Sequence, residues 1–306
     1  MRRTKTMNIH YYHMCANGAD VRDFIISRKD YYAAFNLIAV CAANTKVTIL
    51  SFSLEDSHPH IFLSGSPEDV AQFKTLFEQL YSKYVSATRG GGTGFVFHCE
   101  LYPVTDNQYL TRVATYTIIQ PTKDGKPVLF FDYPWGTGSL YFRRANRTPI
   151  WYYDEAGNIH TPKRFGDLSA RERRSIIHTR RFTIPNDWLV CNGFILPSNY
   201  VDVKAFEAIY QTHNRYRVFI ASPARIEDEL KALMAEQRGI TMEDMEARRI
   251  CGDLCKQMFF TRDTRKLSAT ERVRLAQALR RQHRLTYRQI ATLIHLPETE
   301  IRAYAH

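Results

Sequence analysis

The feature that most constrains the fold is a pair of apolar segments, residues 45–54 and 60–64, on either side of a short polar stretch. Both segments are rich in β-branched and aromatic side chains, which favour strands. Residues 8–16 form a further aromatic run without a helical stripe, and residues 95–98 form a short extended one. We therefore predict strands that meet in an antiparallel sheet.

Two segments between these runs carry the periodicity of amphipathic helices. In residues 29–44, apolar side chains recur at steps of three and four. Residues 66–85 open with Ser66 and Pro67, a typical N-cap and first helical position, and acidic residues follow in the first turn. Strands and helices thus alternate, which predicts an α+β fold in which an antiparallel sheet has helices packed on one face.

The charge of the chain favours a polyanionic partner. Lys and Arg number 42 against 31 acidic residues, a formal net charge of +11 over 306 residues. Nucleic acid is the commonest partner of such chains, and a basic protein on a membrane surface is the alternative. No stretch reaches the roughly 18 apolar residues of a membrane span. Six cysteines are spread along the chain without a disulfide framework, which favours a reducing, cytoplasmic setting.

Two histidines one residue apart stand between the apolar segments, in the sequence Ser57-His58-Pro59-His60. On an extended backbone, residues two apart point to the same face, so both imidazoles can converge on one ion. The alternative is a turn with two half-exposed histidines, which the proline favours because proline is confined to strand edges and turns.

A candidate nucleophile lies on a later helix. Thr105 and Asp106 open this helix, and we expect Pro121 to stop it at or before Gln120. Tyr116 is four residues before Gln120, so the two lie on one face of the last turn. A phenol and a carboxamide on that face can point at the same site. The alternative is that the tyrosine is a core residue and the glutamine caps the helix end.

Three motifs in this order and spacing resemble the single-tyrosine HUH transposases, and within them the REP-associated tyrosine transposases. The motifs are His58-Pro59-His60, Tyr116-Thr117-Ile118-Ile119-Gln120-Pro121 and Tyr133-Pro134-Trp135-Gly136-Thr137. The resemblance covers about residues 8–142 and implies a ferredoxin-like or RRM-like HUH core. The chain departs from the family pattern at Pro59, where relatives have an aliphatic residue, at Gln120, where many have asparagine, and at Gly136-Thr137, where they have two serines.

The resemblance also implies a mechanism. A divalent ion, Mg²⁺ or Mn²⁺, is held by His58, His60 and Gln120 and polarises the scissile phosphate. Tyr116 attacks as the nucleophile, which leaves a 5′-phosphotyrosine and a free 3′-hydroxyl, so that strands can be rejoined. The alternative is a catalytically inactive, sequence-specific DNA-binding protein on the same fold.

The partner that the resemblance implies is single-stranded DNA, folded as a hairpin or palindromic repeat. The setting would be the bacterial cytoplasm, associated with the nucleoid and not with a membrane. Some relatives are dimers with shared active sites and others act as monomers, so a homodimer stays open. The arginines expected to bind DNA are Arg89, Arg112, Arg143, Arg144, Arg288 and Arg302.

These patterns divide the chain into three parts. Residues 1–148 are predicted to form the HUH single-tyrosine catalytic domain, residues 149–262 a basic connector and helical region, and residues 263–306 a helix-turn-helix-like DNA-binding module. In the connector, residues 169–181 are dense in arginine, which favours a helix that lies on phosphates over a solvated linker.

The last part shows the pattern of three short helices. A capping box starts the first of them at Ser268, residues 286–294 form the second, and the third begins at Pro297. Their order and the short connections are typical of a helix-turn-helix. The third helix begins with acidic residues, which is unusual for a helix that contacts bases, so a protein-contacting three-helix unit is the alternative.

Overall fold

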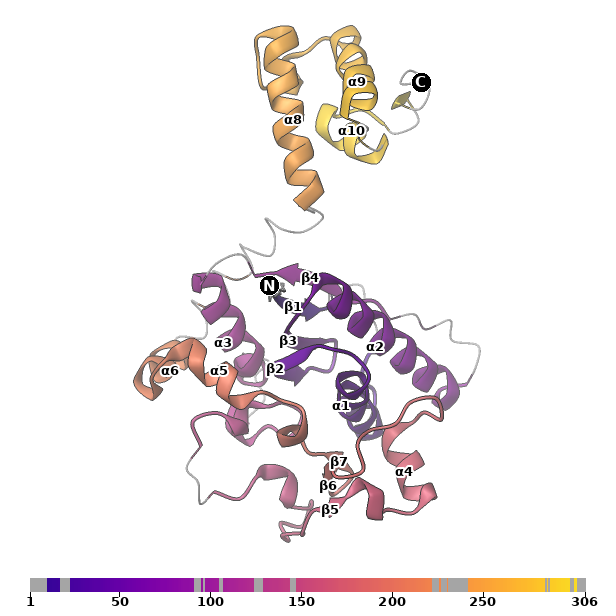
Figure 1. Ribbon diagram of the computed structural model, residues 1–306, viewed down its shortest axis with the longest axis vertical. Helices are drawn as coiled ribbons and strands as arrows, with labels where there is room; N and C mark the ends of the chain where they lie inside the picture. Colours follow the sequence, from indigo (N-terminus) through magenta and orange to yellow (C-terminus); the bar gives the residue numbers. More distant parts are fainter. Residues whose placement is uncertain are drawn as a thin grey trace, which may run out of the picture. The chain divides into compact units, whose positions relative to one another are not determined.

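The protein divides into two compact units between Ala232 and Leu233. The first unit combines a sheet with helices and the second is helical (Figure 1), so the predicted class, an α+β fold followed by a helical region, is confirmed. Residues 149–221 belong to the first unit; the functions assigned to the three predicted domains stay predictions. The computed structural model describes residues 10–16, 23–90, 95, 97–104, 107–123, 129–143, 147–221, 226, 230, 242–283, 285, 287–297 and 300–301.

The centre of the first unit is a four-stranded antiparallel sheet in the order β2–β3–β1–β4 (Figure 1). Strands β2 and β3 pair directly as predicted, with Leu54 opposite Pro59. Pro59 is the first residue of β3, a position where strands tolerate proline. The strands are β1 (His10–Cys15), β2 (Thr48–Leu54), β3 (Pro59–Gly65) and β4 (Glu100–Pro103).

The two faces of this sheet differ because successive side chains of a strand point in opposite directions. One face is apolar, and α1 (Arg28–Ala43) and α2 (Pro67–Thr88) pack on this side, where the Phe35 and Phe52 rings meet at 5.1 Å. The other face carries buried polar side chains and is covered by α3 (Asn107–Lys123) (Figure 1). The sheet therefore lies between two helical layers, with α3 on the opposite side from α1 and α2, whereas the sequence predicts helices on one face only.

The starts of the first two helices follow from their sequence. The Ser27 hydroxyl accepts a hydrogen bond from Asp30 N at 3.3 Å in a capping box, and the Ser66 hydroxyl accepts one from Asp69 N at 3.1 Å. The predicted end of α3 is wrong, because the helix continues to Lys123 with Pro121 inside it. A proline near a helix end removes one hydrogen bond in a turn whose carbonyls already lack intrahelical partners.

Residues 95–98 are predicted to form a short strand or an extended segment; the strand of this part of the chain, β4, begins later, at Glu100. Phe97 is buried instead against Phe24 and Phe77, at ring separations of 4.9 and 5.8 Å. A phenylalanine gains more from burial in such an aromatic cluster than from a place on an edge strand.

The outer edge of β2 is closed by the segment that contains the Tyr-Pro-Trp-Gly-Thr motif. Leu54 N donates to Trp135 O at 3.0 Å, and Thr137 N donates to Phe52 O at 2.9 Å. The Thr137 hydroxyl also accepts a hydrogen bond from Phe52 N at 3.0 Å. A Cβ atom at Gly136 would lie 3.1 Å from Phe52 O. The departure from the family's serine pair therefore fits the close approach of this segment to β2.

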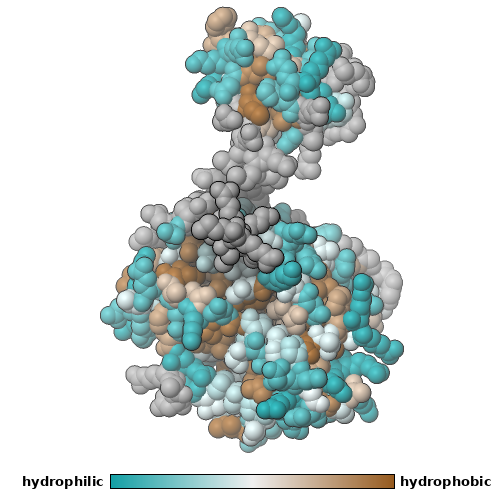
Figure 2. Space-filling view, in the orientation of Figure 1, coloured by the Kyte–Doolittle hydropathy of each residue, from teal (hydrophilic) through white to brown (hydrophobic). Residues whose placement is uncertain are grey.

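The rest of the first unit packs around this core. Among its described residues are a small antiparallel sheet and short helices, namely β5 (Lys163–Arg164), β6 (Leu189–Cys191), β7 (Phe194–Ile195), α4 (Ala170–Ile177), α5 (Val203–Tyr210) and α6 (His213–Ile220). Hydrophilic side chains are spread over the visible face of this unit, with apolar side chains between them (Figure 2). Within the described residues, no helix has the length and apolar character needed to cross a membrane.

The second unit is built from α8 (Met242–Phe259), α9 (Ala269–His283) and α10 (Tyr287–Ile294). These helices share a core that includes Cys255, Leu279 and Ile290. The predicted first and second helices of the last part are therefore present. Of the predicted third helix, the structure describes Pro297 and the helical residues 300–301; the rest lies outside the described residues.

We expect Gly138→Ala to lower the free energy of unfolding of the first unit by about 1–3 kcal/mol. Gly138 follows the segment on β2, and a Cβ atom there would lie 2.5 Å from the backbone oxygen of Phe130. Urea denaturation followed by circular dichroism measures the change. Ser139→Ala, next in the chain, removes a buried hydroxyl that has no hydrogen-bond partner among the described residues, so it should not lower the free energy of unfolding. Equal effects of the two variants would contradict the steric explanation.

Candidate active site

The polar face of the sheet brings together three side chains that can bind a metal. Cys15 of β1 lies opposite His60 of β3 in the antiparallel register, and His13 lies two residues earlier on the same face of β1. The His13 Nε2 and His60 Nδ1 atoms are 3.1 Å apart. The potential ligand atoms of all three residues lie within 4.8 Å of one another, and all three residues are buried. The sequence analysis missed His13 and Cys15, although their spacing repeats the His-x-His pattern.

His58 joins this cluster from the residue before β3. Its ring centroid is 4.5 Å from that of His60, with the ring planes at 66°. The Ser57 hydroxyl is 2.7 Å from His58 Nδ1, which orients the ring. The two imidazoles therefore converge as the extended spacing predicts, while their role as metal ligands stays a prediction.

Tyr116 of α3 lies over the same histidines. Its ring meets His60 and His13 nearly at right angles, at centroid separations of 5.2 and 5.9 Å. The tyrosine is 7% exposed. Two side chains at spacings of four residues flank it on α3, Arg112 on one side and Gln120 on the other. The helix thus places a phenol, a guanidinium and a carboxamide on one stripe that faces the polar side of the sheet.

Burial sets the charge of this cluster. It lowers the pKa of His13 to about 3, and the nearby His58 adds to the effect. His13 is therefore a neutral imidazole at neutral pH, the form that binds metals. The Nδ1 atom of His13 and the Nε2 atom of Gln120 are buried and have no hydrogen-bond partner among the described residues. Unpaired buried polar atoms are costly, which is consistent with a site completed by a ligand.

The donor atoms fit a metal ion. Two nitrogen ligands on a tetrahedral ion with bonds near 2.05 Å lie about 3.3 Å apart, so the two imidazole nitrogens, which share a 3.1 Å hydrogen bond, would have to turn towards the ion but hardly move apart. Imidazole and thiolate ligands suit transition-metal ions better than Mg²⁺, which prefers oxygen. His60 is shared by the set that the structure brings together and by the predicted set with His58 and Gln120, in which the role of Gln120 stays a prediction.

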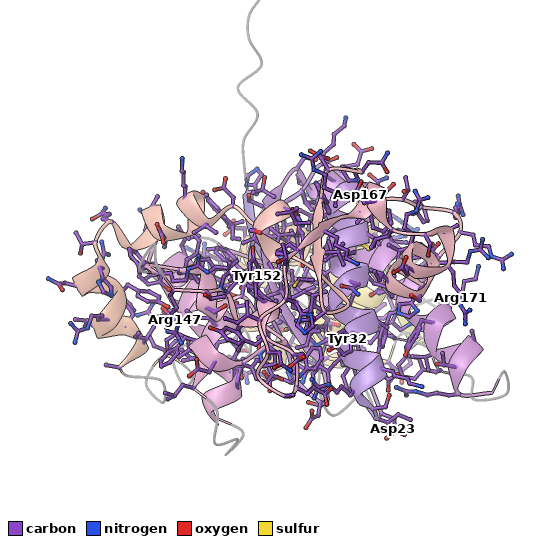
Figure 3. All side chains as sticks on the ribbon, turned by 90° about the horizontal axis from the view of Figure 1, so that it is seen from below. Asp23, Tyr32, Arg147, Tyr152, Asp167 and Arg171 are labelled. Atoms are coloured by element: carbon purple, nitrogen blue, oxygen red, sulfur yellow. The ribbon has the colours of Figure 1, made fainter. Side chains whose placement is uncertain are left out.

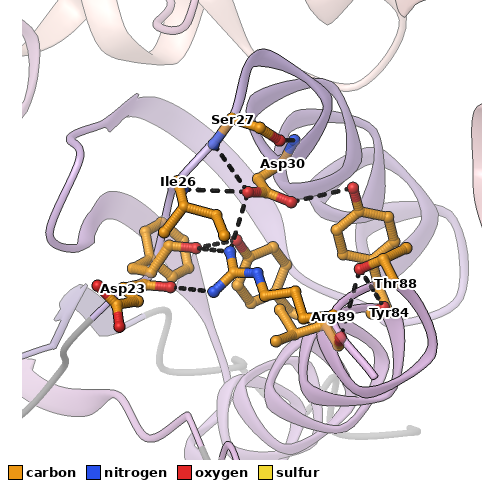
Figure 4. A network of polar contacts seen from close by, with 10 residues as sticks. Asp23, Ile26, Ser27, Asp30, Tyr84, Thr88 and Arg89 are labelled. Atoms are coloured by element: carbon orange, nitrogen blue, oxygen red, sulfur yellow. Dashed lines mark hydrogen bonds and ion pairs between the residues drawn. The ribbon is translucent and has the colours of Figure 1, made fainter. Parts of the chain in front are cut away.

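Arg89, predicted to bind DNA, lies inside the protein at the end of α2 (Figure 4). Its guanidinium forms a 2.9 Å ion pair with Asp30, and it also donates to the carbonyl oxygens of Asp23 and Phe24. The Tyr84 hydroxyl donates to the same carboxylate at 3.1 Å. The Arg89 side chain is 12% exposed and its terminal nitrogens are engaged in this network, so its contact with DNA stays a prediction.

The other arginines expected to bind DNA are placed differently. Arg143 is half-buried and lines a groove of about 480 Å³ together with Phe131 and Phe142. Arg112 is half-buried on α3. Arg288 lies in α10, with its side chain outside the description. Arg144 and Arg302 lie outside the described residues.

We expect Asp30→Asn and Arg89→Gln each to lower the free energy of unfolding by about 3–5 kcal/mol, because each leaves its buried partner unpaired. The double variant should lose less than the sum of the two. Glu155→Gln, which breaks the exposed ion pair with Arg28, is the control and should cost less than about 1 kcal/mol. Additive losses in the double variant would contradict the coupling.

A cobalt titration distinguishes the two ligand sets. If Cys15 binds the ion, Co²⁺ should give a thiolate-to-metal charge-transfer band that Cys15→Ser removes and His58→Ala leaves. Cys191→Ser, which changes a buried cysteine of β6 outside the cluster, is the control and should keep the band. A spectrum without the band in the unaltered protein would exclude the set with Cys15.

Among proteins of known structure, a REP-associated tyrosine transposase bound to a REP hairpin is similar to this chain. The TM-score is 0.32 and the sequence identity 14%, over 50% of this chain and 92% of that chain. No family model and no curated protein sequence matches the chain. A similarity at this score carries no argument about function, so the functional conclusion depends on the motifs and on the geometry of the cluster around His60 and Tyr116.

Proposed function

We propose that this protein is a metal-dependent tyrosine transposase that nicks and transfers single-stranded hairpin DNA through a 5′-phosphotyrosine. The observation that carries this proposal is the meeting of Tyr116 with His60 and His13 on one sheet face, at ring separations of 5.2 and 5.9 Å. A nucleophile beside a group of metal ligands is the arrangement that phosphoryl transfer needs.

Tyr116 is the proposed nucleophile. Its phenolic oxygen forms a bond to the scissile phosphorus as the bond from phosphorus to the 3′-oxygen breaks, and the phenolic proton is lost. The 3′-oxygen takes up a proton and leaves as a hydroxyl. The new phosphotyrosine conserves the bond energy, so a second 3′-hydroxyl can reverse the step and join a different strand.

The surrounding residues have separate tasks in this proposal. His60, with His58 and Gln120 or with His13 and Cys15, would hold a divalent ion such as Mn²⁺ or Mg²⁺. When bound, the ion supplies Lewis-acid stabilisation of the charge on the phosphate. Arg112 lies one helical turn before Tyr116 and is proposed to bind a substrate phosphate.

The rest of the chain would select the DNA. Arg143 and Arg144 are proposed to contact the strand near the catalytic domain. Arg288 and Arg302 are proposed to contact DNA from the helical second unit, in the manner of a helix-turn-helix. A homodimer with shared sites is an alternative to action as a monomer.

The second candidate function is a DNA-binding protein without catalysis. It is favoured by the burial of Tyr116, which is 7% exposed, and by the hydrogen bond between His13 and His60, which has to open before an ion can bind. This candidate predicts hairpin binding without cleavage when Mn²⁺ is added.

We expect Tyr116→Phe to abolish the covalent adduct between the protein and a labelled hairpin oligonucleotide in Mn²⁺, because the variant lacks the attacking oxygen. Denaturing gel electrophoresis measures the adduct. Tyr12→Phe is the matched control, because Tyr12 is a half-exposed tyrosine next to His13 in β1 that points to the opposite face; it should keep the adduct. An adduct that persists in Tyr116→Phe would exclude this tyrosine as the nucleophile.

A further inference from the structure

A cleft of about 460 Å³ lies in the helical layer on the apolar side of the sheet. Leu80 and Lys83 of α2 form one wall. The other wall comes from the end of α4 and the segment after it, with Arg174, His178, Thr179, Arg180 and Arg181. We call this hollow the α2–α4 cleft. Its arginines belong to the arginine-dense stretch at residues 169–181. This stretch has no part in the proposed catalytic site.

The α2–α4 cleft concentrates positive charge without neutralisation. Lys83, Arg174, Arg180 and Arg181 line it, and the described lining residues include no carboxylate. Among the described residues, none of these four cations takes part in an ion pair, whereas Arg28 and Arg147 on the same unit do. Four like charges at one hollow repel one another, and a polyanion that enters relieves this repulsion.

The donors of the cleft suit phosphate groups. Arginine guanidinium groups bind phosphate oxygens in a bidentate manner. The Thr179 hydroxyl accepts a hydrogen bond from Arg181 N at 3.2 Å, so its own hydrogen can still be donated. Burial lowers the pKa of His178, and its ring lies 4.9 Å from Tyr84. The imidazole is therefore neutral at neutral pH, and the charge comes from the four cations.

The lining also indicates which form of nucleic acid fits. Sites for single strands combine cations with aromatic side chains on which unpaired bases stack. Among the described residues that line this cleft, none is a phenylalanine, tyrosine or tryptophan. Contacts from arginine, lysine and hydroxyl groups alone are typical of binding to the phosphate backbone of a duplex, without base recognition.

The position of the cleft separates it from the candidate active site. His178 packs against Tyr84 of α2, and α4 packs against α1, on the side of the sheet where Phe35 meets Phe52. Tyr116 lies on the opposite face. A phosphate in the cleft therefore belongs to a different stretch of DNA from the one at the tyrosine.

We propose that the α2–α4 cleft binds the sugar–phosphate backbone of duplex DNA, apart from the strand that reacts at Tyr116. The proposal depends on the proposed function only in taking DNA as the partner. A transposase-type enzyme that holds a duplex flank or a target duplex on this side would keep it near the reacting strand without competing for the catalytic face.

The test measures binding of the full-length protein to a fluorescein-labelled 20-base-pair duplex without a hairpin, by anisotropy at several KCl concentrations. For Arg174→Gln/Arg180→Gln, affinity should fall and the slope of log K against log [KCl] should become shallower by about 0.9 for each phosphate that the variant no longer neutralises. Arg174→Lys/Arg180→Lys keeps both charges and should retain most of the slope. Thermal melting checks that each variant is folded.

The matched control is Arg164→Gln/Arg171→Gln, which removes the same charge from exposed positions outside the cleft. Arg171 lies at the periphery of the unit, across from Arg147 (Figure 3). This control should change the slope by less than half as much. Equal changes in the two glutamine variants would overturn the proposal, because they would show a general charge effect.

Two further measurements separate this inference from its alternatives. Arg174→Gln/Arg180→Gln should still form the covalent adduct with a short hairpin, and Tyr116→Phe should still bind the duplex with the unaltered slope. Loss of duplex binding in Tyr116→Phe would overturn the separation of the two sites. If the cleft variant lost binding to phosphatidylserine vesicles and kept duplex binding, the cleft would be a membrane site, which also overturns the proposal.

Discussion

The arrangement of the candidate active site depends on the register between β1 and β3. Cys15 lies opposite His60, which places two histidines and a thiol on one face of the sheet. A slip of one residue would turn these side chains towards α1 and α2 and bring apolar residues to the polar face. The apolar face prevents this slip, because Met14, Ile61 and Leu63 are fully buried there. The hydrophobic core therefore also orients the candidate ligands.

Burial of the polar face costs free energy, and hydrogen bonds offset part of this cost. His13 bonds to His60, and Ser53 donates to Glu55 at 2.9 Å. The atoms that stay without a partner among the described residues include His13 Nδ1 and Gln120 Nε2. Buried polar atoms without partners are rare in stable folds unless a ligand or water completes them. The buried polar atoms without partners are therefore a physical reason to expect that a ligand binds at this face.

The arginines that make up the excess of positive charge have different roles. Arg89 stabilises the fold, because it joins the start of α1 to the end of α2 through Asp30 (Figure 4). Arg112 and Arg143 are half-buried and are proposed to contact the substrate. In the α2–α4 cleft, the four cations have no ion-pair partner among the described residues. Net charge predicts that a polyanion binds, but burial and pairing decide which arginines are available to bind it.

Sequence alone determined the local features, namely the hairpin around Pro59, the helix cap at Ser66 and the convergence of His58 with His60. These follow from side-chain periods and hydrogen bonds within a few residues. Tertiary structure decided that His13 and Cys15 join His60 in the candidate metal cluster, that Arg89 is buried, and that Gly136 lies against β2. Each of these depends on segments about 45 to 85 residues apart, and a strand pattern does not specify which residue of a distant strand it will face. The physical reason is that register and packing are settled by the whole core at once.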